Sequence, residues 1–343
     1  MIPNMWYAIL ESSEVKQNNK PHPFKRMGKE LVFWRDQAGK LAVLLDRCPH
    51  RSAKLSPGKI VDGNIQCRFH GFQYNIQGEI QVIPANGRNG PKPEIFKCEA
   101  FVVQEAHGLV WFWNGEPRET YPAIDWFTDI DSKLAFHSTQ VRWAVDYTRA
   151  IEAQLDMAHL PFIHEHTIGR GGKTLVNGPY TTLENNQITV WDSNQPDVGL
   201  PALKPTQLPK PEENIKPLLQ FKYPNAWQLS PTPGLHVVNI TVPIDDENTI
   251  TYIRNYQSFL KVPGLSQFVN WASNMFNRYA LSEDYVVTRT QRPKKADLNI
   301  GERFIPADRP IALYLKHRRD LILAARGQAI PTEVEAELQA ALE

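Results

Sequence analysis

Two cysteines and two histidines fall in two short segments of the chain, Cys48-Pro-His50 and Cys67-Arg-Phe-His70. Thiolate and imidazole are side chains that bind transition metals, and two of each can hold a structural zinc ion in a tetrahedron. Zinc fingers usually place their cysteines together and their histidines together. Here each segment supplies one of each, so the spacing favours another kind of metal centre.

A [2Fe–2S] cluster of the Rieske type accounts for the mixed pairing. In such a cluster two thiolates hold one iron and two imidazoles hold the other, so each of two segments can give one ligand to each iron. The sequence therefore predicts a cluster on Cys48, His50, Cys67 and His70. The one remaining cysteine, Cys98, is expected to be a buried thiol that behaves as a small apolar side chain.

A second group of possible metal ligands follows, because Asp156, His159, His164 and His166 all lie within eleven residues. On a helix, Asp156 and His159 are three residues apart and share a face. His164 is five residues beyond His159, so the two side chains can meet one ion only if the helix ends between them, and Pro161 is placed to end it. The run predicts a metal site, but side-chain chemistry alone leaves both His164 and His166 open as ligands.

Both groups resemble the Rieske non-haem iron oxygenases, a family of aromatic-ring-hydroxylating and demethylating enzymes. The similarity runs from about Trp6 to Arg292 and is strongest at the two motifs. Its nearest branch is the single-subunit one that includes dicamba and vanillate O-demethylases and pheophorbide a oxygenase. One departure is Phe72, since many relatives have Trp there. The matching text is Cys48-Pro49-His50-Arg51, Leu55-Ser56-x-Gly58, Cys67-x-x-His70-Gly71 and Asp156-x-x-His159-x4-His164.

The resemblance implies that His159 and His164 are ligands of a mononuclear Fe(II) and that His166 is not. It implies a third ligand at Asp284 in the run Leu-Ser-Glu-Asp, with Glu283 as the adjacent competitor. Two histidines and one carboxylate on one side of an iron leave positions open for substrate-gated O2 binding.

Asp156 matches the family's bridging aspartate. That residue lies between a Rieske histidine of one subunit and an iron histidine of its neighbour, so the resemblance implies a role in catalysis and a head-to-tail homotrimer. The family usually has Asn three residues before this Asp, whereas this chain has Ala153.

The elements that must carry these residues change in character along the chain. The first part alternates strand-like runs with turn-rich pieces, which predicts an all-β domain. A polar, proline-containing stretch at 114–123 ends that pattern, and we place a domain boundary there, between residues 1–117 and 118–343. The strand-like runs are ELVFWRD (30–36), KLAVLLD (40–46), FVVQE (101–105) and GLVWFW (108–113).

The second part has an α+β pattern, and the resemblance implies a helix-grip (START-like) catalytic domain. The proline-rich stretch at 195–217 is expected to be a long loop. Apolar residues near the second motif, Phe162 and Ile163, and further on Phe221 and Trp227, are candidates for pocket walls or for core packing. Helices are predicted in 142–160, 266–290 and 308–325, and two long strands in 234–259.

Charge and hydropathy exclude several partners. Lys plus Arg number 38 and Asp plus Glu 37, which predicts no nucleic-acid surface. No window approaches the ~18 apolar residues of a membrane span, and the C-terminal run PTEVEAELQAALE is polar and helix-forming. With no leader-like start and only three cysteines, we expect a soluble cytoplasmic protein.

The expected activity is that of a terminal oxygenase, either a mono- or a dioxygenase. The chain has no dinucleotide-binding fingerprint, so electrons from NAD(P)H are expected through a separate ferredoxin and/or flavin reductase. With O2 they would hydroxylate or oxidatively demethylate a small organic substrate, aromatic or cyclic. Two alternatives are a Rieske electron-transfer or ligand-binding protein without oxygenase activity, and a hydrolase with two zinc sites.

Overall fold

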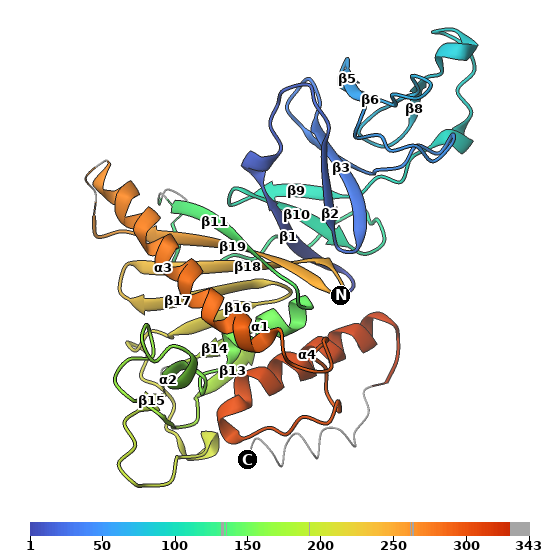
Figure 1. Cartoon of the computed structure of the whole chain (residues 1–343). Coiled ribbons are helices and arrows are strands. Elements are labelled where there is room, and N and C mark those ends of the chain that lie inside the picture. Colours follow the sequence, from blue (N-terminus) through green and yellow to red (C-terminus); the bar gives the residue numbers. More distant parts are fainter. Residues whose placement is uncertain (132–133, 135, 192, 261, 263, 330–343) are drawn as a thin grey trace. The chain divides into compact units, whose positions relative to one another are not determined.

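The computed structural model describes residues 1–131, 134, 136–191, 193–260, 262 and 264–329 (Figure 1). The chain divides into two compact units. The N-terminal unit consists of residues 4–124, and the C-terminal unit consists of residues 1–3 with the chain from residue 125 onward. The two are treated separately below.

The N-terminal unit consists of three small antiparallel sheets, in the orders β1-β10-β9, β2-β3-β4 and β5-β6-β7-β8 (Figure 1). The four predicted strands are confirmed as β3, β4, β9 and β10, because their apolar runs are long enough to cover a core. The strands are β1 (Met5–Glu11), β2 (His22–Arg26), β3 (Lys29–Arg35), β4 (Leu41–Leu45), β5 (Lys59–Val61), β6 (Asn64–Gln66), β7 (Gln73–Tyr74), β8 (Ile80–Val82), β9 (Val103–Ala106) and β10 (Leu109–Asn114).

All three cysteines lie in one hydrophobic core of this unit. Cys48, Cys67 and Cys98 pack with Trp34 and Tyr74, and each is nearly inaccessible to solvent. Burial raises the pKa of the Cys98 thiol, so this side chain is protonated at neutral pH and behaves as the expected small apolar residue. The cysteines therefore anchor both segments in the core, while Arg51 in the first segment and Arg68, Phe69 and His70 in the second are exposed.

The C-terminal unit is built on one seven-stranded antiparallel sheet in the order β11-β19-β18-β17-β16-β14-β13. The two long strands predicted in 234–259 are confirmed as the hairpin β18–β19. A two-stranded sheet pairs β12 with β15. The strands are β11 (Phe136–Trp143), β12 (Leu175–Val176), β13 (Thr181–Glu184), β14 (Gln187–Val190), β15 (Asn194–Gln195), β16 (Leu219–Lys222), β17 (Ala226–Thr232), β18 (Leu235–Asp245) and β19 (Asn248–Gln257).

In the described part of the unit, four α-helices accompany the sheet: α1 (Tyr147–Leu155), α2 (Leu160–Ile163), α3 (Leu265–Thr288) and α4 (Arg309–Ala325). The helices predicted in 266–290 and 308–325 are confirmed as α3 and α4. The long helix α3 packs on β11 and β19, and α1 packs on β18 and β19 (Figure 1). Within the described residues no helix is long and apolar enough to span a membrane. The helix-forming run at 331–343 lies outside the described residues.

The helix predicted over 142–160 is wrong in its extent. Its first residues belong to β11, and α1 begins only after Asp146, whose side chain accepts a hydrogen bond from the backbone N–H of Thr148 at 2.9 Å. The helix then ends at Leu155, before Pro161 is reached. Pro161 instead lies in the first turn of α2, where its missing N–H leaves no hydrogen bond unmade.

The proline-rich stretch at 195–217 is confirmed as a loop, since its regular structure within the described residues is limited to the end of β15 and one short 3-10 helix, Pro205–Gln207. The loop joins β15 to β16 and so returns the chain to the main sheet.

Candidate metal centres

The two Cys/His segments share one backbone pattern. The N–H of Cys48 donates to the carbonyl of Ala53 at 2.8 Å, and the N–H of Ser52 donates back to Cys48 at 2.9 Å. In the second segment Cys67 and Gly71 make the equivalent bonds, at 2.8 Å to Phe72 and 3.0 Å back to Cys67. Each segment is thus a tight turn that begins at its cysteine.

These turns bring the two imidazoles together as well as the two thiols. The ring centroids of His50 and His70 lie 4.6 Å apart, and the Phe72 ring stacks on His50 at 4.5 Å. The Nδ1 atom of His50 is buried and has no hydrogen-bond partner among the described residues. A buried nitrogen left unpaired beside a second imidazole fits a ligand of an iron.

The two thiols also lie next to each other. Cys48 and Cys67 interact directly, and burial raises the pKa of Cys67. The hydroxyl of Tyr74 lies 3.2 Å from Cys48 Sγ, and this buried tyrosine is a contact that sequence reasoning missed. Two neighbouring thiols and two neighbouring imidazoles match the donor set of a Rieske cluster.

In the C-terminal unit a turn after α1 positions the first histidine of the second motif. The Asp156 side chain accepts hydrogen bonds from the backbone N–H groups of Ala158 at 2.7 Å and His159 at 3.3 Å. Its other oxygen lies 3.5 Å from His159 Nδ1. Asp156 and His159 therefore meet through this turn, and not along one face of a continuous helix as predicted.

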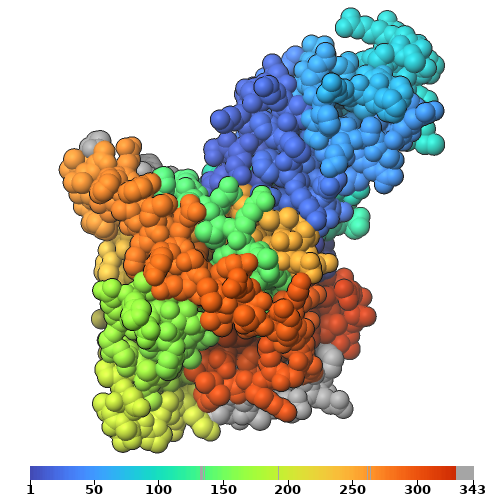
Figure 2. Space-filling model, in the orientation of Figure 1, coloured from blue at the N-terminus to red at the C-terminus, as the bar shows by residue number. Residues whose placement is uncertain are grey.

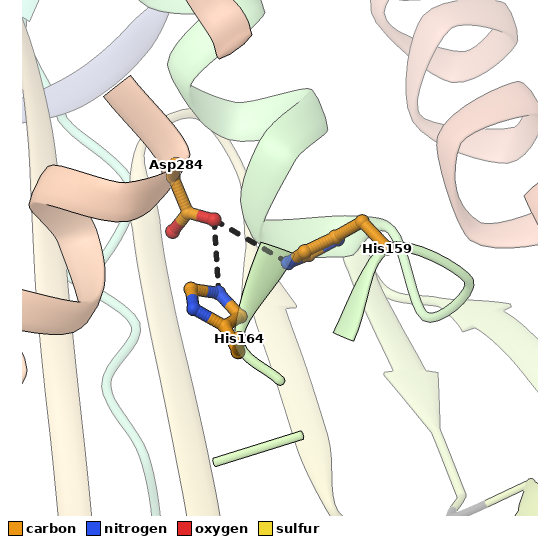
Figure 3. A group of neighbouring side chains, drawn as sticks. All are labelled: His159, His164 and Asp284. Atoms are coloured by element: carbon orange, nitrogen blue, oxygen red, sulfur yellow. Dashed lines mark ion pairs between the residues drawn. The ribbon is translucent and has the colours of Figure 1, made fainter. Parts of the chain in front are cut away.

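The short helix α2 then turns the chain so that His164 faces His159. His159 and His164 flank α2, and their ring centroids are 5.2 Å apart. Asp284, from α3, completes the group: its Oδ1 lies 3.4 Å from His159 Nε2 and 3.0 Å from His164 Nε2 (Figure 3). All three donor atoms lie within 4.8 Å of one another.

The hydrogen bonds around this group indicate that it can hold a cation. Glu283 Oε2 lies 2.8 Å from His164 Nδ1, and Asp156 lies near His159 Nδ1, so carboxylates engage both Nδ1 positions. With the proton on Nδ1, each Nε2 directs a lone pair toward Asp284 Oδ1, which is buried and accepts no hydrogen bond in the described part of the chain. Ligand atoms held about 2.1 Å from one ion at right angles lie roughly 3 Å apart. The distances of 3.4 and 3.0 Å from Asp284 Oδ1 to the two Nε2 atoms are close to this value.

The two alternative ligands, Glu283 and His166, do not face the space between His159, His164 and Asp284. Glu283 faces the Nδ1 side of His164 and also accepts a hydrogen bond from Thr167 Oγ1 at 2.8 Å, so it orients the imidazole. His166 is 82% exposed and pairs with Glu165. Consecutive helix positions point about 100° apart, which is why adjacent Glu283 and Asp284 reach different atoms.

Electrostatics favour charged side chains here. The pKa of Asp156 is lowered: burial acts to raise it, but the hydrogen bonds and charge of His159 outweigh burial. Burial acts to lower the pKa of His164, but the negative charges of Asp284 and Glu283 outweigh burial and raise it. The group therefore attracts positive charge, whether a proton or a metal ion.

An apolar cavity of about 320 Å³ adjoins the His159–His164–Asp284 group. Part of its wall comes from one face of the sheet, where Trp227 lies opposite Asn239, and Leu229 lies opposite both Leu219 and Val237. Another part comes from α2 and α3, which contribute Leu160, Ala280 and Leu281. Trp227 is thus the one of the four candidate wall residues that lines this cavity within the described chain. Phe221 is fully buried against Tyr314, Phe162 is exposed, and Ile163 borders a different cavity.

That second cavity, also of about 320 Å³, borders His159 and Asp284 of the same group but is lined mostly by charged and polar side chains. Four residues border both cavities: Ala153, Asp156, His159 and Asp284. The group therefore stands between a mostly apolar space and a polar one.

Two family models match the chain. Residues 5–103 match the Rieske [2Fe-2S] domain, and residues 143–323 match the vanillate O-demethylase oxygenase C-terminal domain. The two matches cover the two Cys/His turns and the His159–His164–Asp284 group, respectively.

Curated relatives agree with these matches. The vanillate O-demethylase oxygenase subunit of Pseudomonas sp. (strain HR199 / DSM 7063) is 28% identical over 203 residues, 58% of this chain and 54% of the relative. Methylxanthine N1-demethylase NdmA of Pseudomonas putida is 26% identical over 344 residues, 93% of this chain and 88% of the relative. Chlorophyllide a oxygenase of Chlamydomonas reinhardtii is 32% identical over 170 residues, 49% of this chain and 25% of the relative. The chain thus spans about half or less of the length of the first curated relatives, from 25% to 54%.

Solved structures support the fold. The structure of Pseudomonas putida CBB5 NdmA has a TM-score of 0.74 at 22% identity, covering 99% of this chain and 95% of that one. Dicamba monooxygenase bound to dicamba has a TM-score of 0.70 at 18% identity, covering 96% and 99%.

Proposed function

Since this chain belongs to the family of the vanillate O-demethylase oxygenase C-terminal domain and carries a Rieske domain, we propose that it is the terminal oxygenase component of a multicomponent Rieske system. In this role it hydroxylates or oxidatively demethylates a small organic substrate with O2. The observation that carries the proposal is the buried His159–His164–Asp284 group, whose three donor atoms converge beside an apolar cavity.

The two metal centres follow from the donor sets. Cys48 and Cys67 hold one iron of a [2Fe–2S] cluster, and His50 and His70 hold the other. His159, His164 and Asp284 hold a mononuclear Fe(II), as two histidines and one carboxylate do in other O2-activating sites. The cluster supplies single electrons, and the iron supplies a site where O2 binds and is activated.

This chain's own residues prepare that site. Glu283 and Asp156 hold the imidazoles of His164 and His159 in the orientation in which Nε2 faces Asp284. The apolar wall excludes water from around the substrate. It also holds the substrate against the metal-facing side of the cavity. A volume of about 320 Å³ supports a ring-sized substrate, aromatic or cyclic.

Electrons reach the mononuclear site between subunits of a homotrimer. We assign Asp156 as the bridge, because it contacts His159 and its side chain remains partly exposed. It could therefore also accept a hydrogen bond from His70 of the partner subunit. A surface for assembly is offered by α3, which lies open on one face of the C-terminal unit (Figure 2). Five large apolar side chains of this helix are exposed. These are Phe268, Trp271, Met275, Phe276 and Tyr279.

The electron donor is a separate ferredoxin and/or flavin reductase that takes electrons from NAD(P)H. We place the protein in the cytoplasm, and we assign residues 1–117 to the cluster domain and residues 118–343 to the catalytic domain.

The test measures oxygenation directly. The protein and a surrogate reductase are incubated with NADH, ¹⁸O₂ and a panel of aromatic, N-methyl, O-methyl and tetrapyrrole compounds. We expect substrate-dependent O2 consumption and label in the hydroxylated product or in released formaldehyde. Metal analysis accompanies it, with two irons and two sulfides expected in the cluster and one further iron.

The matched control uses the neighbouring histidine. His164→Ala should lose the mononuclear iron and all oxygenation, whereas His166→Ala changes an exposed side chain and should keep both. A brown protein that transfers electrons but oxygenates nothing in the panel would favour the electron-transfer alternative. Zinc without sulfide would refute both the oxygenase function and the electron-transfer alternative.

A further inference from the structure

The polar cavity contains a buried carboxyl group, Glu152. The reaction proposed above consumes protons, and no residue has yet been assigned to supply them. Glu152 lies on α1, one turn before Asp156, and its side chain is only 5% exposed. It lines the polar cavity, which also reaches His159 and Asp284. Glu302 and Arg303 line the same cavity and are exposed, so the cavity extends from the metal-facing group to the surface.

The two oxygens of Glu152 have different surroundings. Oε2 lies 2.8 Å from Arg149 Nη1, but Oε1 is buried without a hydrogen-bond partner among the described residues. An ionised carboxylate in such a place leaves one oxygen unsolvated, whereas a protonated carboxyl carries its hydrogen there and can pass it to water in the cavity. The geometry thus fits a group that gains and loses a proton.

The charges around Glu152 balance so that both states are accessible. Arg149 favours the ionised form, while burial and the carboxylates of Glu302 and Asp156 oppose it. Tyr314 of α4 also interacts with Glu152. The pKa of Glu152 is raised to about 7, with burial as the largest cause.

We propose that Glu152 is the proton-relay residue of this oxygenase, taking protons from solvent through the polar cavity and delivering them toward the metal-facing side of Asp156 and His159. The inference rests on the proposed function. In R–H + O2 + 2 e⁻ + 2 H⁺ → R–OH + H2O, a C–H bond and the O–O bond break, a C–O bond forms, and both protons end in water. The electrons come from the reductase through the cluster.

In the proposed function the substrate occupies the apolar cavity, and outside the residues that it shares with the polar cavity its lining is mostly apolar, so less water has access there. Ala153 borders both cavities, and its methyl group leaves space beside Asp156 at a position where a larger side chain would project. Protons and substrate then approach the metal group from different sides.

The first experiment asks whether Glu152 holds a proton, without using catalysis. Infrared spectra of the full-chain protein are recorded across pH for the wild type, Glu152→Gln and Glu302→Gln. We expect a protonated-carboxyl band that titrates near pH 7, the pKa to which Glu152 is raised, and that is absent in Glu152→Gln. Glu302→Gln should keep the band with a lower midpoint, because one opposing negative charge is gone. Loss of the band in Glu302→Gln only, or its persistence in Glu152→Gln, would overturn the proposal.

The second experiment asks whether that proton is used. Pre-reduced, fully metallated enzyme is mixed with O2 and substrate, and the rate of product formation is followed across pH in H2O and D2O. General acid–base groups commonly contribute about 10²–10⁴-fold, so Glu152→Gln should slow product formation at least tenfold and remove the pH dependence near 7. Metal content should be unchanged. An unaltered rate and pH profile would refute the relay.

A conservative variant covers the case in which Glu152→Gln does not fold. Glu152→Asp keeps the charge and shortens the side chain, so it should retain a titrating band and show a shifted pH profile; an unshifted profile would contradict the proposal. The two proposals fail in different ways. A titrating band in a protein that oxygenates no substrate would refute only the proposed function, and an active Glu152→Gln enzyme with a normal pH profile would refute only the relay.

Discussion

At the scale of single residues, the unpaired Oδ1 of Asp284 carries the most chemical information. A buried carboxylate oxygen near two imidazole Nε2 atoms is costly unless a cation compensates it. The sequence motif predicted these three residues, but it left Glu283 open beside Asp284 and His166 open beside His164. Local sequence could not decide, because the choice depends on which helix face meets the other motif more than one hundred residues away.

Tyr74 gives a prediction at this scale. Its hydroxyl lies 3.2 Å from Cys48 Sγ and stabilises the more negative, reduced cluster when it donates a hydrogen bond. Tyr74→Phe should lower the cluster's reduction potential by roughly 40 mV, the equivalent of about 1 kcal/mol for one electron. Redox titration followed by electron paramagnetic resonance measures this, with Tyr121→Phe as a control distant from the thiols. A potential that does not move would mean that the hydroxyl donates elsewhere.

Glu152 gives a second prediction, on stability. Its pKa is raised from 4.5 to about 7 in the folded protein, so the stability from its protonated form is complete below about pH 4.5 and is lost as pH rises through 7. The loss amounts to about 3 kcal/mol, at about 1.4 kcal/mol for each pKa unit. Glu152→Gln should therefore gain free energy of unfolding relative to the wild type between pH 5 and pH 8, as urea denaturation at both values would reveal. A difference that stayed constant with pH would contradict the raised pKa.

At the scale of elements, the strands were predictable and the turn between α1 and α2 was not. The runs at 234–259 and 266–290 are long and regular, so their apolar pattern decides their structure. The end of α1 instead depends on Asp156, whose side chain binds the backbone N–H groups of Ala158 and His159 and competes with further helix. A proline five residues later, Pro161, misled the prediction because the same residue type can begin a helix as well as end one.

Asp156 gives the prediction for this element. Asp156→Asn keeps the size of the side chain and an oxygen for the turn, but removes the charge that faces His159. Both metal sites should assemble, while the rate at which a reduced cluster is reoxidised by O2 with substrate falls about 10–100-fold or more. Stopped-flow absorbance measures this in protein of verified metal content and assembly. Near-normal reoxidation would mean that the bridge lies elsewhere.

At the scale of the whole molecule, the sequence predicted two metal centres and an oligomer. The residues of each metal centre lie within one chain, whereas an oligomer needs several copies. The two turns, the seven-stranded sheet and the metal-facing group all form within their own units. The proposed trimer depends on surfaces of separate copies, which no local pattern encodes. Light scattering that returned a stable, active monomer would refute it, because the proposed electron route needs the partner subunit.

Iron removal supplies a test at the same scale. The ligands come from the chain around α2 and from α3, so the ion joins two segments that are remote in sequence. Chelation of the mononuclear iron should lower the Tm of the C-terminal unit by several degrees, as expected when about 3–4 kcal/mol of binding free energy is lost. Restoring Fe(II) should reverse the change in wild type and His166→Ala but not in His164→Ala. Equal Tm values with and without iron would contradict this ligand set.

The part of the cavity wall that stands on strands has a consequence for how such a protein can diversify. The wall residues Trp227, Leu229, Val237 and Asn239 stand on strands, while every proposed iron ligand stands on or beside a helix. A mutation in the wall can therefore reshape the space for substrate without displacing a ligand, so selection can explore new substrates while oxygen chemistry is preserved. Libraries restricted to these four wall positions should yield variants with altered substrate range at a high frequency of retained iron.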